Sequence, residues 1–416
     1  MQIRPITILR VFIPFAAGYF LSYLYRVVNA VIAPDLIAEI GVGPSALGLL
    51  TAVYFISFAS FQLPLGILLD RYGPRKIEAV LLLFAGLGAF IFSIADSLAG
   101  LAVGRAFIGF GVSACLMAAF KAFTLWFPRE KWPLVNGFQM AAGGLGALAA
   151  TSPVESAMQF TDWRGVFTIL AVLTLLVGAL VFFVVPEKQA TAQGESFYSQ
   201  MRGVQKVFTS RTFWRTAPLT TMSQAAFLAI QGLWSGPWLK NVALLDRPAI
   251  ADVLFWVAVA MITGFITLGT LVERLSRRGV SVLTMAVTGM GLFMVVQVLI
   301  ILAPSGYVVP LWMAFGYLGT SGIIAYSALS QSFPAYLSGR VTTAVNLLVF
   351  IAAFAGQWAI GAIISLWPVG KAGELTVAGF SAGFSLMLVL QIVCLVYFLY
   401  CGRKNTEIDS SDKSSK

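Results

Sequence analysis

The chain has 416 residues, of which 59% are hydrophobic and 11% are charged, and it contains no histidine. A soluble domain carries roughly 25% charged residues, so this composition excludes an ordinary water-soluble protein. The net charge of +10 does not indicate nucleic-acid binding, because the basic residues form no patch with interleaved aromatic residues. Cys115, Cys394 and Cys401 have no metal-ligand spacing. We therefore expect no metal and no cofactor.

Apolar segments of about 20 residues recur along the chain, and each is long enough to cross a hydrocarbon core about 30 Å thick. They are continuously apolar, which argues against the alternating pattern of a β-barrel. The first is too long for a signal peptide and is predicted to be a retained span. The sequence predicts an all-α membrane protein with twelve transmembrane helices, at 11–33, 46–69, 77–95, 100–124, 134–156, 165–185, 214–238, 251–272, 281–303, 308–331, 341–366 and 378–401.

The longest polar stretch separates the sixth predicted span from the seventh. We therefore predict an N-terminal six-helix bundle over 1–185, a cytoplasmic linker over 186–213, a C-terminal six-helix bundle over 214–401 and a polar cytoplasmic tail over 402–416. Most of the 27 Lys and Arg residues fall on one side when both termini are placed inside, as the positive-inside rule requires. This pattern favours a multi-pass protein of a bacterial cytoplasmic (inner) membrane with cytoplasmic N- and C-termini.

Two charged loops repeat along the chain. "GILLDRYGPRK" at 66–76 and "GTLVERLSRRG" at 269–279 each follow the second span of their half. Two six-span repeats of the same orientation are the layout of one large transporter architecture. Three basic residues would be enough for a positive-inside anchor, but Asp70 adds nothing to an anchor. A carboxylate at a helix boundary can instead bind arginine side chains or a helix N-terminus.

At this point the chain resembles the major facilitator superfamily over essentially its full length. The loop at 66–76 meets the family signature Gly-x-x-x-Asp-Arg-x-Gly-x-Arg-Lys in full, and "RAFIGFG" at 105–111 and "DWRGVF" at 162–167 resemble two further family motifs. The resemblance implies two six-helix pseudo-repeat bundles that alternate access, with the loop packed against the start of the eleventh span at "SGRVTTA". It assigns the conformational switch to Gly66, Asp70, Arg71, Gly73, Arg75 and Arg340.

Ionisable residues within spans are costly and tend to be functional. Arg26 lies about 15 residues into the first span, too deep to reach the interface easily. It either binds an anionic substrate group or pairs with a backbone carbonyl or a carboxylate. Lys121, near the inner end of span four, either contacts substrate or extends to the cytoplasm. Arg105 has a structural or coupling role by the family motif, with an interfacial arginine as the alternative.

Polar and aromatic residues complete the predicted substrate group. Tyr19 and Tyr23 share one helix face with Arg26. Span seven breaks at Gly236–Pro237 just after its polar residues, and span eleven is interrupted by amides, although residues of either kind also act as contacts between helices. The candidate substrate-binding residues are Arg26, Tyr23, Tyr19, Lys121, Gln231, Trp234, Asn346 and Gln357.

Acidic residues are sparse within the spans. None lies near the middle of a span, and Glu155 is expected to be the most embedded, followed by Asp35. Cationic residues without a central acid favour an anion or a zwitterion. "SYLYRVVNAVIAPDL" resembles the first span of the organic-anion symporters (sialin-like, hexuronate and galactonate carriers), in which the arginine binds the substrate carboxylate. Tyr25 and Val112 replace the two acids that carry the coupling proton in that branch. The coupling candidates that remain are Glu155, Asp35 and Arg105.

These patterns predict a secondary active transporter that works by alternating access and imports a small organic anion or zwitterion. The alternative is a proton-coupled exporter of drugs, metabolites or siderophores, although the exporter signature Gly-x-x-x-Gly-Pro-x-x-Gly-Gly is missing from 143–156. An enzyme would need a nucleophile with its base or a metal cluster at membrane depth, and no such spacing occurs. We expect a monomer whose partners are its substrate and the lipid bilayer, with a co-transported proton left open and no nucleic acid.

Overall fold

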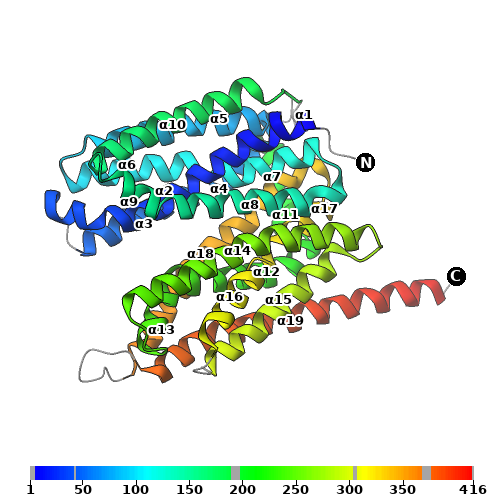
Figure 1. Ribbon diagram of the computed structural model, residues 1–416. Helices are drawn as coiled ribbons and strands as arrows, with labels where there is room; N and C mark the ends of the chain where they lie inside the picture. Colours follow the sequence, from blue (N-terminus) through cyan, green and yellow to red (C-terminus); the bar gives the residue numbers. More distant parts are fainter. Residues whose placement is uncertain (1–4, 42–43, 189–196, 303–306, 368–375, 415–416) are drawn as a thin grey trace. The chain divides into compact units, whose positions relative to one another are not determined.

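The computed structural model describes residues 5–41, 44–188, 197–302, 307–367 and 376–414 (Figure 1). Within these ranges every regular element is a helix. The helices up to residue 188 are α1 (Pro5–Thr7), η1 (Ile8–Phe12), α2 (Ile13–Ile40), α3 (Pro44–Ser60), α4 (Gln62–Tyr72), α5 (Pro74–Ser93), α6 (Leu98–Val112), α7 (Cys115–Trp126), η2 (Arg129–Lys131), α8 (Trp132–Ala149), α9 (Ser152–Ala157) and α10 (Trp163–Val184). The helices after residue 196 are α11 (Phe197–Phe208), α12 (Arg211–Ala229), η3 (Ile230–Trp234), α13 (Ser235–Asn241), α14 (Arg247–Ser276), α15 (Val282–Ile301), α16 (Val308–Gly319), α17 (Gly322–Gln331), η4 (Ala335–Leu337), α18 (Ser338–Ile364) and α19 (Val377–Ser414).

The length and hydropathy of these helices suit a membrane. Among the described residues, nine helical segments are long and apolar enough to cross one, and the bent pair α3 and α4 makes a tenth. Helices α8 and α12 lie where the fifth and seventh spans are predicted and are not among these ten. Both place amides in the protein interior, at Gln139 and Gln224, which lowers their hydropathy. The protein therefore has an all-α membrane fold.

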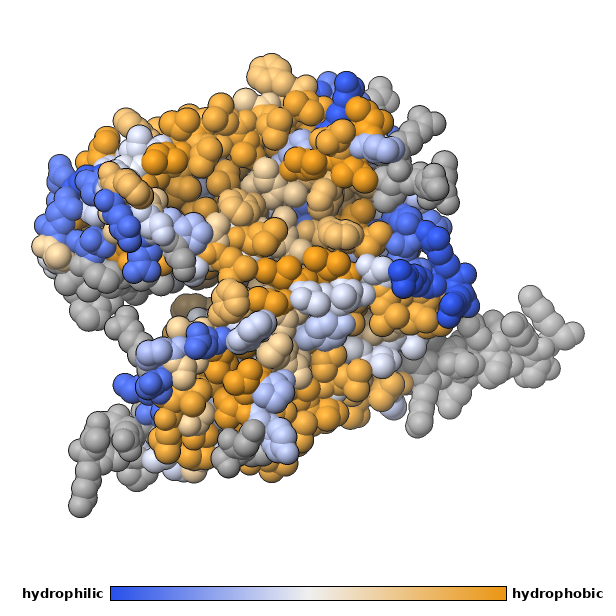
Figure 2. All heavy atoms as spheres, viewed as in Figure 1, coloured by the Kyte–Doolittle hydropathy of each residue, from blue (hydrophilic) through white to orange (hydrophobic). Residues whose placement is uncertain are grey.

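Apolar side chains cover much of the visible surface (Figure 2). Leu176 and Phe183 of α10 are 60% and 78% exposed. A contiguous apolar surface of this kind is unfavourable in water and favourable in hydrocarbon. These side chains therefore face the lipid, whereas Thr174 of the same helix is buried.

The chain divides into two compact units. The first comprises Met1–Val204 and Phe333–Ala344, and the second comprises Gln205–Ser332 and Val345–Lys416. In the first unit α5 packs against α6 and α10, α2 against α8, and α3 against α6 (Figure 1). In the second unit α14 packs against α16, α15 against α17, and α12 against α19.

Glycines bring the backbones of α5 and α6 together. A Cβ at Gly88 would lie 2.6 Å from the Ile108 nitrogen, and one at Gly111 would lie 2.3 Å from the Ala85 nitrogen. No larger side chain fits at either position. Close backbone packing of this kind stabilises helix pairs in membranes, where dispersion contacts replace the hydrophobic effect.

Span seven is irregular, but the predicted break is misplaced. The α-helical geometry changes at the π-helical turn η3, and the chain then continues as α13 through Gly236 and Pro237. Pro237 is tolerated there because it falls in the first turn of α13, where a backbone N–H needs no partner within the helix. The irregular turn therefore contains Gln231 and Trp234 themselves.

Candidate functional site

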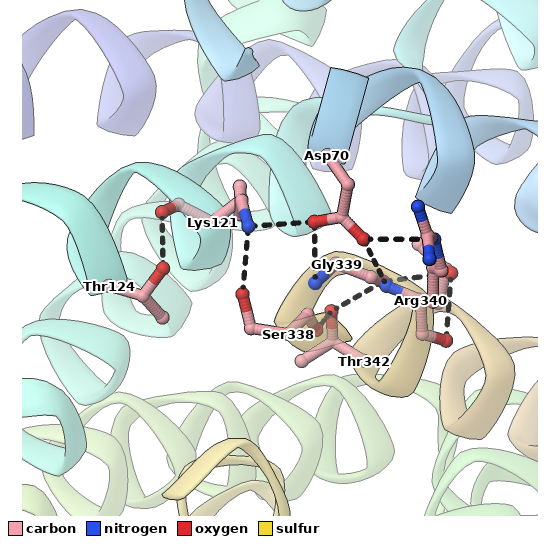
Figure 3. A network of polar contacts seen from close by, with 8 residues as sticks. Asp70, Lys121, Thr124, Ser338, Gly339, Arg340 and Thr342 are labelled. Carbon is pink, nitrogen blue, oxygen red and sulfur yellow. Dashed lines mark hydrogen bonds and ion pairs between the residues drawn. The ribbon is translucent and has the colours of Figure 1, made fainter. Parts of the chain in front are cut away.

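The carboxylate of Asp70 joins three segments of the first unit (Figure 3). It lies near the end of α4 and is fully buried. Its Oδ1 accepts a hydrogen bond from the Gly339 N–H at 3.2 Å, and its Oδ2 accepts one from the Arg340 N–H at 3.3 Å. Arg340 Nε lies 3.4 Å from the same Oδ2. Asp70 therefore binds the N-terminal turn of α18, where unpaired N–H groups and the helix dipole favour an anion.

Lys121 belongs to this network. Its Nζ lies 2.7 Å from Asp70 Oδ1 and donates to Ser338 Oγ at 3.1 Å. The side chain is fully buried, so the alternative that it extends to the cytoplasm is wrong. The ion pair also occupies its ammonium, which argues against the expected contact with substrate. The sequence does not reveal this partner because Lys121 and Asp70 belong to different spans.

Close packing of α4 on the start of α18 depends on Gly66. A Cβ at this position would lie 2.3 Å from Thr343 Oγ1 and 3.1 Å from the Arg340 Cα. The second atom belongs to the backbone and cannot move aside easily. The glycine of the loop signature therefore allows the approach that brings Asp70 to the amides of α18.

Gly73, Arg75 and Lys76 lie at the C-terminal end of the loop signature. Gly73, at φ +83°, separates α4 from α5 in a conformation that favours glycine. Arg75 Nε donates to the Phe182 carbonyl at 2.7 Å, near the C-terminus of α10. Lys76 pairs with Glu187, and this hydrogen bond holds the pKa of Glu187 below its ordinary value. Arg75 therefore contacts α10 rather than α18.

Arg71 lies outside the network in Figure 3. Its guanidinium carbon is 5.1 Å from the ring centroid of the adjacent Tyr72, and the side chain is half-buried. Of the six predicted switch residues, the structure therefore gathers Gly66, Asp70 and Arg340 at one place.

Arg26 lies among aromatic rings. Its guanidinium carbon is 4.5 Å from the Tyr23 ring centroid, 5.6 Å from that of Phe58 and 5.8 Å from that of Phe55. The side chain is half-buried. Tyr19 and Tyr23 form an edge-to-face pair with centroids 5.1 Å apart. Cations are attracted to aromatic faces, so the rings hold the guanidinium without neutralising its charge.

The two tyrosines differ in their surroundings. Tyr19 is buried, and its hydroxyl donates to Met140 Sδ of α8 at 3.3 Å. Tyr23 is half-buried and stacks against Arg26. The structure therefore brings Tyr23 and Arg26 together, with Tyr19 fixing this face of α2 against α8.

Asn29 is a polar residue that sequence reasoning missed. It follows Arg26 on the same face of α2, and it is buried. Neither its Oδ1 nor its Nδ2 has a hydrogen-bond partner among the described residues. An unsatisfied buried amide is costly, so this group is available to a ligand or to water. The spacing of Arg26 and Asn29, at i and i+3, was the available signal.

Arg105 is buried and fixes the backbone beside Arg26. Its Nη1 donates to the Tyr25 carbonyl at 2.9 Å, and its guanidinium carbon lies 4.7 Å from the Tyr54 ring centroid. The alternative of an interfacial arginine is therefore wrong. Tyr25 is also buried, with its hydroxyl 2.8 Å from Thr174 Oγ1 of α10. The Tyr25 side chain thus packs between α2 and α10.

In the second unit, two of the candidate residues meet. Trp234 Nε1 donates to the Gln357 carbonyl at 3.0 Å, which joins η3 to α18. The Gln231 carbonyl accepts from Ser235 Oγ at 2.9 Å. Gln231 and Gln357 are both half-buried. Irregular helical turns often occur at functional sites, and this one directs the Trp234 indole toward α18.

Asn346 has a different partner. It is buried in the second unit, and the Tyr326 hydroxyl donates to its Oδ1 at 3.5 Å. Tyr326 belongs to α17, so this contact joins α17 to α18. The structure therefore places Asn346 apart from the contact between Trp234 and Gln357.

The acidic residues differ from expectation. Glu155 is exposed in α9, outside the segments that suit a membrane, and Asp35 is half-buried in α2. Glu155 is therefore not the most embedded acid. Asp70 and Glu78 are fully buried, and Glu78 lies within the span formed by α5. The sequence obscures Glu78 because it follows the charged loop by one turn and reads as part of it.

Among the described residues there is no group of three or more Cys, Asp or Glu side chains that could hold a metal ion. The charged side chains described above in the first unit include the ion-pair network of Asp70, the ring-lined Arg26, the buried Arg105 and the buried Glu78. This arrangement can bind an anion at Arg26 and hold a helix end at Asp70.

Comparison with known proteins places these features in a family. The model of the Major Facilitator Superfamily matches residues 15–357. A probable sulfoacetate transporter of Cupriavidus necator is 31% identical over 42% of this chain and 42% of its own length. The hexuronate transporter of Escherichia coli is 25% identical over 48% of this chain and 50% of its own length. The chain thus spans about half the length of the curated relatives it matches.

Solved structures show the same fold. The E. coli fucose:proton symporter superposes with a TM-score of 0.72 at 15% identity, over 94% of this chain and 98% of that one. A bacterial homologue of the iron transporter ferroportin, in an outward-facing state, gives a TM-score of 0.73 at 15% identity, over 95% of this chain and 100% of that one.

Proposed function

Since the chain belongs to the Major Facilitator Superfamily, we propose that it is a secondary active transporter that imports a small organic anion. The observation that supports an anionic substrate is the position of Arg26. This cation is held in the first span by aromatic rings, and the unsatisfied amide of Asn29 lies one turn further on. A guanidinium binds a carboxylate or a sulfonate through two parallel hydrogen bonds, and an amide can bind a neighbouring hydroxyl or oxygen.

Relatives support this class of substrate. Their names give sulfoacetate, hexuronate and L-galactonate as substrates, and each of these carries a carboxylate. We assign the anionic group of the substrate to Arg26 and its uncharged polar groups to Asn29 and Tyr23. We propose transport of the substrate without any catalysed reaction. We further place the chain in a bacterial cytoplasmic membrane with both termini inside, as the basic loops indicate.

The Asp70 network serves as the conformational switch in this proposal. Breaking the bonds from Asp70 to Gly339 and Arg340 releases the start of α18, and re-forming them restores it. Lys121 neutralises the carboxylate while the network is closed. The alternation between these two arrangements is what a carrier needs in order to open its site to one side at a time.

Ligand stabilisation tests the substrate class. The melting temperature of the purified chain is measured with sulfoacetate, D-glucuronate and L-galactonate, because a ligand at a hundred times its Kd stabilises by about 2.7 kcal/mol. We expect at least one anion to raise the melting temperature of the wild type, and Arg26→Ala to abolish this rise. Arg278→Ala, which removes the same charge from an exposed loop, should retain it. An equal rise in the Arg26→Ala variant would contradict the proposal.

A further inference from the structure

Glu78 is a buried carboxyl group that the proposed function does not yet use. It lies one turn into α5, its side chain has no exposed surface, and neither Oε1 nor Oε2 has a hydrogen-bond partner among the described residues. Asp70, the other fully buried acid of this unit, has Lys121 and Arg340 as partners. Within the part of the chain that the structure describes, Glu78 therefore stands out as a buried acid without a counter-charge.

Helices α2 and α7 enclose this carboxyl group. A Cβ at Gly18 of α2 would lie 2.2 Å from Glu78 Oε1 and 3.8 Å from Cys115 Sγ of α7. The carboxyl group therefore packs directly on the backbone of α2, and only glycine leaves room for it. Cys115 is a free, buried thiol of α7 that borders the same position at Gly18.

The other charged groups on the surrounding helices have partners elsewhere. On α5 itself, Arg75 and Lys76 bind Glu187. On α7, Lys121 binds Asp70 of α4.

The charged and titratable groups named on four further helices also have contacts elsewhere. Arg105 of α6 binds the Tyr25 carbonyl, and Arg164 of α10 pairs with Glu39 and Asp96. On α4, Arg71 stacks on its neighbour Tyr72. On α2, Tyr19 donates to Met140 and the guanidinium of Arg26 lies over Tyr23.

We propose that Glu78 binds the proton that this transporter carries together with its organic anion. A carboxylate without a cation or a donor is unfavourable in an apolar interior, whereas the neutral acid can be buried there. Uptake of one proton converts the carboxylate to the neutral acid, and release returns that proton to water. The charged form needs water or a donor, which can reach Oε1 only if α2 or α7 moves away from α5.

This position links the proton to both other sites. Arg26 lies roughly 12 Å further along α2 from Gly18, and Lys121 lies roughly 9 Å further along α7 from Cys115. A shift of α2 that opens Glu78 therefore displaces the helix that carries Arg26. A shift of α7 displaces the helix that supplies the counter-charge of Asp70. The protonation of Glu78 can thus bias the arrangement of both helices.

Infrared spectroscopy tests proton binding without a substrate. The full chain in lipid nanodiscs is compared between acidic and alkaline buffers, for the wild type, Glu78→Gln and the control Glu155→Gln. We expect a carbonyl band of a protonated carboxylic acid that titrates with pH, disappears in Glu78→Gln and remains in Glu155→Gln. A spectrum that Glu78→Gln leaves unchanged would overturn the proton site. Gel filtration and the melting temperature show that the nearly isosteric variant folds.

Transport of D-glucuronate in proteoliposomes tests the coupling, which rests on the proposed function. Exchange of internal for external D-glucuronate needs no net proton movement, whereas accumulation driven by an imposed pH gradient does. We expect Glu78→Gln to retain exchange within about twofold and to lose gradient-driven accumulation by at least about tenfold. Equal loss of both activities indicates a structural role, and accumulation at the wild-type rate excludes coupling through Glu78; either would overturn the proposal.

The experiments distinguish failure of the proposed transport function from failure of the proton site at Glu78. A wild type that moves no D-glucuronate and is stabilised by none of the three anions would contradict both the substrate class and the coupling. The infrared titration would still decide whether Glu78 binds a proton.

Discussion

The ammonium nitrogen of Lys121 lies 2.7 Å from Oδ1 of Asp70, and neither side chain has any exposed surface. The carboxylate also accepts the N–H groups of Gly339 and Arg340. Two buried charges of opposite sign stabilise each other only while both are present, because each was removed from water on folding. The pair therefore holds α4, α7 and the start of α18 together as one structural element.

Removing one member of this pair should strongly destabilise the protein. We expect Lys121→Met to lower the free energy of unfolding by about 3–5 kcal/mol, since it leaves the Asp70 carboxylate buried without its ammonium partner. Thermal melting of the purified variant measures the change. Lys206→Met, which removes an exposed ammonium from α11, should change stability by less than about 0.5 kcal/mol.

The double variant separates the pair from its surroundings. Asp70→Asn with Lys121→Met removes both charges, so it should lose less stability than the sum of the two single variants. A strictly additive loss would show that the two side chains do not interact.

Gly66→Ala should also destabilise the start of α18. Its methyl group would lie 2.3 Å from Thr343 Oγ1 and 3.1 Å from the Arg340 Cα, so α4 and α18 must separate. We expect a loss of about 1–3 kcal/mol in the free energy of unfolding, as for other overpacked sites. The matched control is Gly291→Ala in α15, where a Cβ meets nothing within 4 Å and the alanine favours the helix. A melting temperature unchanged by Gly66→Ala would show that the two helices are not in contact.

Stability should depend on pH through Glu39. The Trp163 indole donates to Glu39 at 2.6 Å and Arg164 Nε donates at 3.1 Å, and these bonds, the first above all, hold the pKa of Glu39 below its ordinary value. Because the pKa is lower in the folded state, these bonds stabilise the protein fully at pH values above the ordinary glutamate pKa of about 4.3. This contribution is lost as the pH falls through the folded-state pKa.

Melting curves from neutral pH to about pH 3 measure this dependence. Over the acidic part of the range, the melting temperature of the wild type should fall further than that of Glu39→Gln. Parallel curves for the two proteins would rule out Glu39 as the source.

The sequence predicts the helical membrane fold well, because continuous apolar runs leave no other structure that satisfies the backbone in lipid. The chemistry of a carboxylate in a basic loop predicts only that Asp70 has a cationic or helix-terminal partner. The resemblance of the loop to the family signature implies that this partner lies at the start of the eleventh span. The fold therefore follows from local pattern, whereas the position of this contact follows from the resemblance.

Other features depend on contacts between spans. The pairing of Lys121 with Asp70 and the bond from Arg105 to the Tyr25 carbonyl join residues far apart in the chain, and no local pattern reveals them. Glu78 lies so close to the charged loop that its burial shows only when α2 is packed against α5. The irregular turn of span seven falls before Gly236 because the proline is accommodated in the first turn of the next helix.

The seam between α5 and α6 has a consequence for the protein outside its membrane. At Gly88 and Gly111 the two backbones are so close that no acyl chain or detergent tail can enter between them. Solvents that replace lipid can compete for the surfaces of α10 and α19, but not for this contact. The α5–α6 pair should therefore be the last part of the first unit to lose its order during extraction, and the natural place from which it re-forms.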